Sequence, residues 1–368
     1  MINDIIAVAK RDNNKKRKFL LVNKIQGKHV PVSPKKALKL FDMLYENVKN
    51  KFEKENILVI GFSETATAIG SRLAINLGCN YIQTTREYKQ GIKYIYFSEE
   101  HSHAEEQKLA FSDIDNVSKN IDRIVFAEDE ITTGKTIFNI VNIIKNSFSD
   151  NNNKIKFTAV SILNGMSDEA IKEFKNNNID FCYLYKIDNS NRDEEIEKYK
   201  YNGKYFDKIK YENQKYNELV FEGMKDPSHI MIDSKEYNKI CFELSENIIK
   251  NIDLSKYSNI LVLGTEEFMY PPIFVGNEIS KLNKNVFFHA TTRSPICVSS
   301  EKEYPLNKRY SLSSFYDEER NTFIYNLKKY DCVIIITNSQ IPLSEGCKNI
   351  VSALYNEGCE NIYIVRWC

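Results

Sequence analysis

Short apolar runs recur along the chain and alternate with amphipathic segments. Each run holds about four to six apolar residues, is rich in β-branched types and is bounded by Gly, Asn or charged residues, as is typical of a strand buried in a parallel sheet. In 37–48 and 133–148 the apolar positions recur at helical spacing instead. Strands alternating with helices predict an α/β doubly wound fold. The expected strands are 56–61, 123–128, 156–163, 259–264, 332–337 and 361–367.

The chain also contains an internal repeat. Residues 29–64 and 229–267 each begin with a His and an apolar/polar alternation, continue through an amphipathic helix and reach the sequence N-I-L-V-x-G. Each is followed by a helix, a strand and a Thr-Thr-Arg sequence, at 83–87 and 290–295, and later by another buried strand. We expect one fold built twice, the alternative being a chance similarity between two α/β units.

Length and composition set limits on the class of protein. A chain of 368 residues with 42% hydrophobic and 27% charged residues predicts two globular domains. The net charge of +1 gives no general attraction for nucleic acid, so a nucleic-acid partner is not expected. No apolar run reaches the ~18 residues of a membrane span, and no signal peptide is recognisable. The 8 cysteines lack a CxxC pair, so we expect reduced thiols and a cytoplasmic location.

The stretch 124–136, IVFAEDEITTGKT, carries the most specific chemistry. An apolar strand is followed by three acids and then by Thr-Thr-Gly-Lys-Thr at the start of an expected helix. Open α/β sheets bind ligands at the carboxyl ends of their strands. The unpaired N–H groups of a helix N-terminus, together with the threonine hydroxyls, form a cradle for a monophosphate.

The acids exclude a nucleoside-triphosphate loop of the Walker A type. Such a loop needs Gly five residues before Gly134, and that position is Asp129. Carboxylates accept hydrogen bonds from hydroxyls, so phosphate and acids together fit a ribose 5-phosphate with its 2′- and 3′-hydroxyls on Glu128 and Asp129. The alternative is an acidic turn with Thr132 as a helix cap.

Two acids, two variable residues and T-T-G-x-[ST] after an apolar strand resemble the phosphoribosyl pyrophosphate (PRPP) motif of type I phosphoribosyltransferases. Glu130 departs from the family, which usually has an apolar residue there. The resemblance implies that residues 1–190 form a type I phosphoribosyltransferase domain with Glu128 and Asp129 as catalytic residues. The residues implied to bind the 5′-phosphate are Thr132, Thr133, Gly134, Lys135 and Thr136.

The same resemblance implies three further parts of the site. The pyrophosphate-binding residues would be Ser63, Glu64, Thr65, Ala66, Thr67 and Arg86, although a merely tight turn is the alternative for 61–70. A mobile flap over 86–110 would contribute Lys89, Glu100, His101 and His103, the two histidines contacting diphosphate or solvent or, alternatively, a metal. A hood over 15–34 would contact the acceptor through Lys24, Lys28 and His29, the alternative being an exposed basic hairpin.

The implied reaction displaces pyrophosphate from PRPP, the co-substrate, by a nitrogen of a base-like acceptor. The protein would align the acceptor and stabilise the departing charge in an oxocarbenium-like transition state. Mg²⁺, the expected cofactor, would be bound through PRPP and Asp129 and would offset the repulsion between carboxylates and phosphates.

The second half extends the resemblance to nearly the whole chain. Thr-Arg-Ser-Pro at 292–295 is similar to the signature of the bacterial PRTase/TRSP family, found in gene clusters associated with tellurite-resistance proteins. The family context implies synthesis of a nucleotide-like small molecule. We expect a connector at 191–228 and a TRSP domain at 229–368.

The TRSP domain is expected to be a degenerate copy of the first. Thr337 and Asn338 stand where the first half has its two acids. The domain either binds another phosphate or a product, or packs on the first as an intramolecular pseudo-dimer, and a homodimer is a further expected assembly. Its candidate site residues are Glu266, Glu267, Arg293 and Ser294, with Arg309 nearby.

Three functions remain open from the sequence. The leading one is a Mg²⁺-dependent phosphoribosyltransferase. The second is a PRPP-binding regulator without catalysis, and the third is a related enzyme that releases a base from a nucleotide.

Overall fold

The structure of the protein, a computed structural model, describes residues 2–12, 14, 17–98, 107–148 and 154–368. They form two compact units, each built from separate stretches of chain. We name each unit after the repeat whose central strands it holds. The N-terminal unit comprises Phe41–Asn189 and Lys225–Lys239. The C-terminal unit comprises Ser190–Met224 and Ile240–Cys368 together with Met1–Leu40. Among the described residues, no helix is both long and apolar enough to cross a bilayer.

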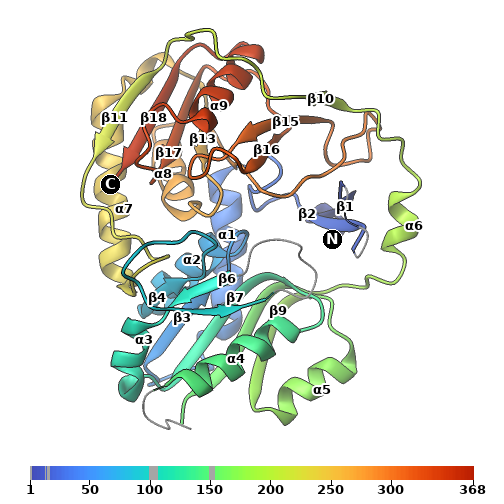
Figure 1. Ribbon diagram of the computed structural model, residues 1–368, viewed down its shortest axis with the longest axis vertical. Coiled ribbons are helices and arrows are strands. Elements are labelled where there is room, and N and C mark those ends of the chain that lie inside the picture. The colour runs from blue at the N-terminus through green and yellow to red at the C-terminus, as the bar shows by residue number, and fades with distance from the viewer. Residues whose placement is uncertain (1, 13, 15–16, 99–106, 149–153) are drawn as a thin grey trace. The chain divides into compact units, whose positions relative to one another are not determined.

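A sheet with the strand order β12-β4-β3-β7-β8-β9 forms the centre of the N-terminal unit (Figure 1). The strands from β4 to β9 run parallel, and β12 pairs antiparallel with β4. The central strand β3 is apolar and buried along its length, as expected when both faces of a sheet are covered. The strands are β3 Ile57–Gly61, β4 Asn80–Gln83, β7 Arg123–Ile131, β8 Lys156–Asn164, β9 Ile179–Lys186 and β12 Ile232–Asp233.

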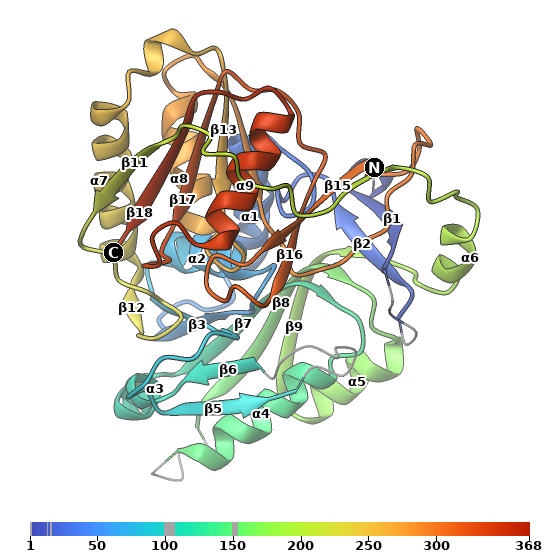
Figure 2. The same cartoon turned by 45° about the horizontal axis from the view of Figure 1, so that its top comes forward.

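Helices cover both faces of this sheet. The chain moves from β3 to β4 in one direction and from β7 to β8 and β9 in the other, and right-handed crossovers therefore place α2 on one face and α4 and α5 on the opposite one. A hairpin, β5 with β6, is inserted between β4 and β7, and β5 contacts α4 (Figure 2). These elements are α2 Thr67–Leu77, β5 Tyr94–Phe97, β6 Gln107–Ala110, α3 Ser112–Val117, α4 Lys135–Ser147 and α5 Asp168–Asn176.

The C-terminal unit has a parallel sheet with the order β11-β18-β17-β13-β14. Helix α9 covers one face, where its apolar residues pack with those of β15, and α8 contacts β13, β14 and β17 from the other (Figure 2). A second sheet has the order β10-β15-β16. These elements are β10 Lys204–Phe206, β11 Asn217–Phe221, β13 Asn259–Gly264, α8 Tyr270–Ser280, β14 Asn285–Ala290, β15 Lys308–Ser313, β16 Asn321–Tyr325, β17 Cys332–Thr337, α9 Glu345–Asn356 and β18 Ile362–Trp367.

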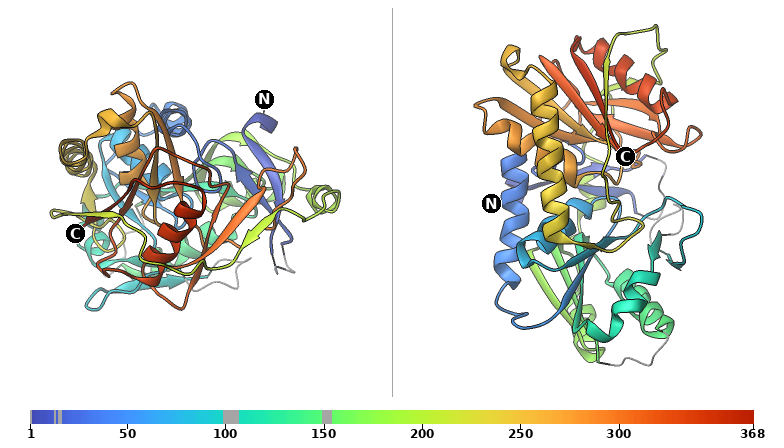
Figure 3. Two further views of the ribbon diagram at one scale, coloured as in Figure 1. Left: turned by 90° about the horizontal axis from the view of Figure 1, so that it is seen from above. Right: turned by 90° about the vertical axis from the view of Figure 1, so that its left-hand side faces the viewer.

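An N-terminal hairpin completes the C-terminal unit. Its strands, β1 Ile6–Lys10 and β2 Phe19–Asn23, lie beside the short helix α6 Arg192–Ile196 (Figure 3, left). Buried residues of both strands share an apolar cluster with residues between β14 and β16, including Ile296 and Tyr304. The predicted hood therefore packs with the strands of the second repeat.

The two sheets share one topology. The order β4-β3-β7-β8 in one unit matches β14-β13-β17-β18 in the other, and in each a hairpin separates the second strand from the third. The parallel α/β class predicted from the apolar runs is confirmed, and the shared order supports the duplication. The six expected strands are β3, β7, β8, β13, β17 and β18.

The segment ahead of the first helix of each repeat pairs with the sheet that holds the other repeat's strands. Val32 pairs antiparallel with Phe288 of β14, and Ile232 of β12 pairs antiparallel with Tyr81 of β4. Helices α1 Pro34–Val48 and α7 Ser234–Asn251 follow these segments, and each begins in one compact unit and ends in the other. The two halves of the chain thus exchange equivalent segments.

The register of the two exchanges is the same. Tyr81 lies opposite Val59, and Phe288 lies opposite Val262. Val59 and Val262 are the same position of the repeated sequence N-I-L-V-x-G. The exchange is therefore a property of the repeated fold and not an irregularity of one half.

The compact units do not follow the domain boundaries proposed from the sequence at every point. Those boundaries were drawn from contiguous stretches, whereas residues 1–40 and 225–239 lie in the unit of the opposite repeat. The connector 191–228 also carries structure, since β10 pairs with β15 and β11 pairs with β18.

The exchange predicts that neither half of the chain folds well alone. We expect fragments 1–209 and 210–368, cut in a stretch without helix or strand, to co-purify when co-expressed, because each supplies a segment that the other's sheet requires. Tagged pull-down and size-exclusion chromatography measure this. Val32→Lys, at a position 6% exposed, should weaken the association, whereas Met43→Lys, at a position 39% exposed, should not. Two fragments that elute separately as folded monomers would contradict the prediction.

Candidate functional site

The acids of the first repeat lie on a strand, not in a turn. β7 continues through Glu128 and Glu130, which pair with Ser161 and Leu163 of β8, and ends at Ile131. The expected strand, 123–128, stops at the first of the three acids. β7 continues because β8 extends equally far, so that the backbone of the acidic segment still finds hydrogen-bond partners.

Asp129 joins the end of β7 to the loop after β3. Its Oδ1 accepts hydrogen bonds from the hydroxyl of Thr65, at 2.9 Å, and from the backbone N–H of Glu130, at 3.0 Å. Burial raises the pKa of the Asp129 carboxyl above its ordinary value, and the negative charge of Glu130 raises this pKa further. Asp129 is thus an acid held in place but easier to protonate than a solvated one.

The neighbouring acids have different surroundings. Glu128 accepts the backbone N–H of Asp129 at 3.0 Å, and Glu130 accepts a long hydrogen bond, 3.4 Å, from the side-chain amide of Asn189. Successive side chains of a strand face opposite sides of the sheet. Of the three acids, Asp129 is therefore the one that faces the loop after β3.

The threonine-rich loop leads directly into α4. Gly134 is the N-cap of this 13-residue helix and has φ +79°, a conformation that disfavours other residues. A Cβ at Gly134 would also lie 2.4 Å from Phe174 Cε1. Thr133 Oγ1 accepts the N–H of Lys135 at 3.4 Å. The helix therefore starts with a glycine cap, and the positive end of its dipole lies at the threonine-rich loop.

The loop after β3 is held by a buried polar cluster that the sequence analysis did not identify. The N–H of Ser63 donates to Thr84 Oγ1 at 2.8 Å, and the side-chain amide of Gln107 donates to the Ser63 carbonyl at 3.0 Å. Gln107 Oε1 also accepts the Thr84 hydroxyl at 2.5 Å. Gln107 is the first residue of β6, and nothing in its local sequence pointed to this role because both partners are distant along the chain.

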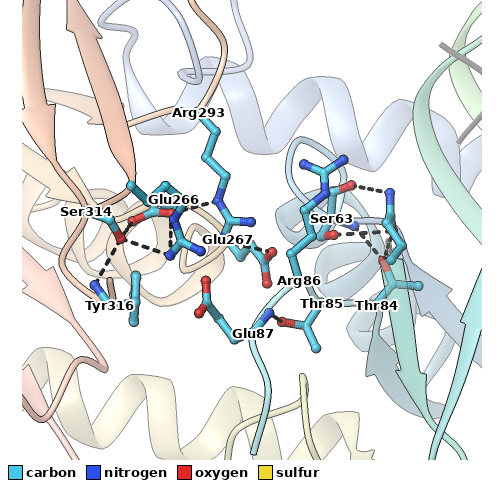
Figure 4. A network of polar contacts seen from close by, with 12 residues as sticks. Ser63, Thr84, Thr85, Arg86, Glu87, Glu266, Glu267, Arg293, Ser314 and Tyr316 are labelled. Carbon is cyan, nitrogen blue, oxygen red and sulfur yellow. Dashed lines mark hydrogen bonds and ion pairs between the residues drawn. The ribbon is translucent and has the colours of Figure 1, made fainter. Parts of the chain in front are cut away.

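The expected basic residue Arg86 follows this cluster. Thr85 pairs with Lys108 of β6 through two backbone hydrogen bonds, and the Lys108 ammonium donates to the Arg86 carbonyl at 3.0 Å. Thr85 Oγ1 accepts the N–H of Glu87 at 2.9 Å, as the labelled side chains on the right of Figure 4 show. The backbone on both sides of Arg86 is therefore fixed by the flap hairpin. Lys89 is exposed, and Glu100, His101 and His103 lie outside the described residues.

Around the described residues, no three His, Cys, Asp or Glu side chains gather into a metal cage. Mg²⁺ usually binds one or two carboxylates together with substrate phosphates and water. Asp129, fixed by Thr65 at the sheet edge, fits that role, whereas a site made only of protein ligands would not suit this arrangement.

The second repeat reproduces the backbone of this site. The N–H of Glu266 donates to Thr291 Oγ1 at 3.0 Å, as Ser63 does to Thr84. Thr292 pairs with Phe323 of β16 through two backbone hydrogen bonds, as Thr85 does with the second strand of its hairpin. Ser63 and Glu266 are therefore equivalent positions, and so are the two arginines that end the Thr-Thr-Arg sequences.

The side chains of the second repeat differ. Arg293 forms ion pairs with Glu266, at 2.7 Å, and with Glu267, at 3.3 Å. Ser294 contributes its backbone, with its carbonyl accepting the Tyr325 hydroxyl at 2.7 Å. Arg309 instead pairs with Asp12 of the N-terminal segment at 2.9 Å.

The positions of the two missing acids are also occupied by internal contacts. Thr337 Oγ1 lies 3.0 Å from the donating hydroxyl of Thr265, and Asn338 Oδ1 accepts the Tyr316 hydroxyl at 2.6 Å. These side chains carry no charge. The second sheet therefore lacks the carboxylates that mark the end of β7.

The expected hood residues lie in the C-terminal unit. The Lys28 ammonium is fully buried and donates to the carbonyls of Glu266, at 2.6 Å, and Thr291, at 2.9 Å. His29 is buried with its ring edge toward Tyr325, and Lys24 is partly exposed. Contacts to backbone carbonyls give Lys28 a structural role in this unit.

Two family models match successive parts of the chain. Residues 5–185 match a family described as phosphoribosyl transferase, and residues 231–354 match the TRSP domain found C-terminal to it. No curated protein sequence matches significantly.

Solved structures similar to the chain include several adenine phosphoribosyltransferases. The Trypanosoma brucei enzyme, in complex with AMP, pyrophosphate and ribose-5-phosphate, is 16% identical, with 50% of this chain and 77% of that chain covered and a TM-score of 0.36. The Thermoanaerobacter pseudethanolicus enzyme is 15% identical, with 50% and 98% covered and a TM-score of 0.34. The Saccharomyces cerevisiae enzyme is 12% identical, with 49% and 94% covered and a TM-score of 0.33.

The N-cap glycine of α4 gives a testable prediction. Gly134→Ala should lower the free energy of unfolding by about 2–5 kcal/mol, because a left-handed backbone conformation costs about 1–2 kcal/mol and overpacking about 1–3 kcal/mol. Gly91→Ala is the matched control, since Gly91 has φ +86° but nothing within 4 Å of an added Cβ. Denaturant unfolding measures both variants. Equal losses would show that the contact with Phe174 does not constrain the loop.

Proposed function

The chain belongs to the family of phosphoribosyltransferases that carry a C-terminal TRSP domain, and we propose that its first repeat transfers ribose 5-phosphate from PRPP to a nitrogen of a base-like acceptor. The observation that carries the proposal is the hydrogen bond between Thr65 and Asp129. It joins the acidic end of β7 to the small-residue loop after β3, beside the start of α4. One sheet edge then offers groups for the phosphate, sugar and diphosphate of one donor.

The phosphate and sugar of PRPP are assigned to the segment from β7 to α4. The backbone and hydroxyls of 132–136 would bind the 5′-phosphate, supported by the glycine cap at Gly134 and the helix dipole. Glu128 and Asp129 would accept hydrogen bonds from the 2′- and 3′-hydroxyls. Because the two side chains face opposite sides of the strand, Asp129 would take the side nearer the diphosphate.

The diphosphate is assigned to the loop 63–67 and to Arg86. Ser63, Thr65, Ala66 and Thr67 have small or short side chains, and the backbone of Ser63 is fixed by Thr84 and Gln107. Because this loop is already ordered, anion binding loses little conformational entropy in it. Lys89, on the flap segment, would add a second positive charge when the flap covers the donor.

Mg²⁺, when bound to the diphosphate and Asp129, would neutralise charge on the leaving group as a Lewis acid. The carboxylate of Asp129 would orient the ribose and meet the positive charge that develops on it. The carbon–nitrogen bond to the acceptor forms as the bond from the anomeric carbon to the pyrophosphate oxygen breaks. The acceptor nitrogen loses its proton, and pyrophosphate leaves with the bonding electron pair.

The proposal predicts that Asp129→Asn lowers turnover by two or more orders of magnitude, a loss of about 3 kcal/mol or more in transition-state stabilisation, with little change in the fold. Pyrophosphate release with PRPP, Mg²⁺ and a panel of bases measures turnover, and calorimetry measures donor binding. Glu173→Gln, which removes an exposed charge on α5, is the control. Full activity of Asp129→Asn would refute the assigned sugar site. Saturable PRPP binding without turnover on any acceptor would favour a binding regulator.

The surroundings of Asp129 also predict a pH dependence. Protonation removes its charge, and burial with the nearby Glu130 raises its pKa, so PRPP affinity should fall on acidification at a higher pH than an ordinary aspartate would give. Glu130→Gln removes the like charge, lowers the pKa of Asp129 and should move the acid limb to lower pH. Calorimetric titration of PRPP across pH measures this. An unchanged or alkaline-shifted limb in Glu130→Gln would contradict it.

A further inference from the structure

The second repeat contains a buried carboxylate surrounded by cationic and hydroxyl donors. Glu266 is fully buried. Its Oε2 lies 2.7 Å from Arg293 Nε and 3.2 Å from Arg320 Nη2, and its Oε1 accepts the Ser314 hydroxyl at 2.5 Å. The left part of Figure 4 shows the side chains of Glu266, Arg293 and Ser314 directed toward one another. Two guanidinium groups and a hydroxyl together are donors that could bind a small anion.

Glu266 lies at the position that Ser63 occupies in the first repeat. The matching backbone hydrogen bonds make Glu266 equivalent to Ser63 and Arg293 equivalent to Arg86. In the first repeat the loop carries a short hydroxyl side chain at this position. In the second it carries a carboxylate that reaches the arginine itself.

Two backbone N–H groups of the loop in the second repeat are bonded within the loop. The N–H of Phe268 donates to the Thr265 carbonyl at 2.8 Å, and that of Met269 donates to the Glu267 carbonyl at 3.0 Å. Helix α8 then begins with Tyr270 followed by two prolines, which have no N–H. The first turn of α8 therefore lacks backbone donors at both proline positions.

The N-terminus of α9 is capped by a side chain. Ser344 caps α9 by accepting the N–H of Cys347 at 3.2 Å, and Glu345 places a negative charge in the first turn. At the equivalent place in the first repeat, α4 begins at the glycine cap. A capped helix with an acid in its first turn satisfies its own dipole and donors.

We propose that the second repeat retains an anion site that it fills with its own carboxylate, Glu266, in the place where the first repeat takes the diphosphate of its donor. This inference rests on the proposed function for the identity of the anion. The competing ligand is a phosphate or pyrophosphate ion, which Glu266 excludes through its pairing with Arg293 and Arg320. The second repeat is thereby stable without a ligand.

Charge balance explains why removing Glu266 should reopen the site. Arg293 and Arg320 pair with the carboxylates of Glu266 and Glu267, and the Lys28 ammonium donates to the backbone carbonyl of Glu266 beside them. Glu266→Gln keeps the shape but leaves three cations with one carboxylate, and a buried charge without its partner is strongly destabilising. A small anion that binds there restores the balance and stabilises the folded state by mass action.

The test is the number of pyrophosphate ions bound per chain, measured by calorimetry without Mg²⁺, together with the pyrophosphate-dependent rise of the melting temperature. The unsubstituted protein should bind about one ion and Glu266→Gln about two, with a larger thermal shift. The double variant Glu266→Gln/Arg293→Gln should lose the additional ion. Where Glu266→Gln is insoluble on its own, pyrophosphate during refolding should restore the soluble yield, compared with chloride at equal ionic strength.

Two results would overturn the inference. One is a Glu266→Gln protein that gains neither a second ion nor any pyrophosphate-dependent rescue. The other is an unsubstituted protein whose bound pyrophosphate is lost in Arg293→Gln, because the second site would then be open already. Arg86→Gln separates this test from the proposed function: an unchanged pyrophosphate count in Arg86→Gln would refute the assignment of the first site, while the comparison of Glu266→Gln with its double variant still decides the second.

Discussion

The parallel pairing of β3 with β7 is the constraint on which the rest of the first repeat depends. Its register places Gly61 beside Ala127, so the loop after β3 and the acids at the end of β7 emerge at one edge of the sheet. Backbone hydrogen bonds fix that juxtaposition before any side chain contributes. Asp129 and Thr65 can meet only because of it, and the helix that begins at the glycine cap follows a few residues later.

The same backbone frame supports opposite chemistry in the two repeats. In the first, the loop after β3 carries a serine at this position, and α4 begins at a glycine cap. In the second, Glu266, the prolines of α8 and the Ser344 cap satisfy or delete the corresponding donors. Fold and function have therefore separated after duplication, since a few side chains decide whether a sheet edge is open to an anion.

How much the sequence could predict depended on the range of the interactions involved. The central strands and the helix expected over 37–48, which is α1, were predictable because continuous apolar runs and helical periodicity are local signals. The extension of β7 through its acids was not, because it depends on pairing with β8. Gln107 was missed because its partners lie far along the chain. The exchange of segments could not be predicted for a related reason. The apolar/polar alternation around Val32 and Ile232 would be the same whichever sheet these residues joined.

The exchange of segments also affects how the protein can be made on the ribosome. Asp12 and its ionic partner Arg309 are separated by 297 positions in the sequence. At about 5–20 residues synthesised per second, that wait is on the order of 15–60 s. The ion pair between Asp12 and β15 can therefore form only late in synthesis. During that interval the hairpin of β1 and β2 also lacks Ile296 and Tyr304, with which its buried residues pack, so part of its apolar face stays uncovered and accessible to chaperones.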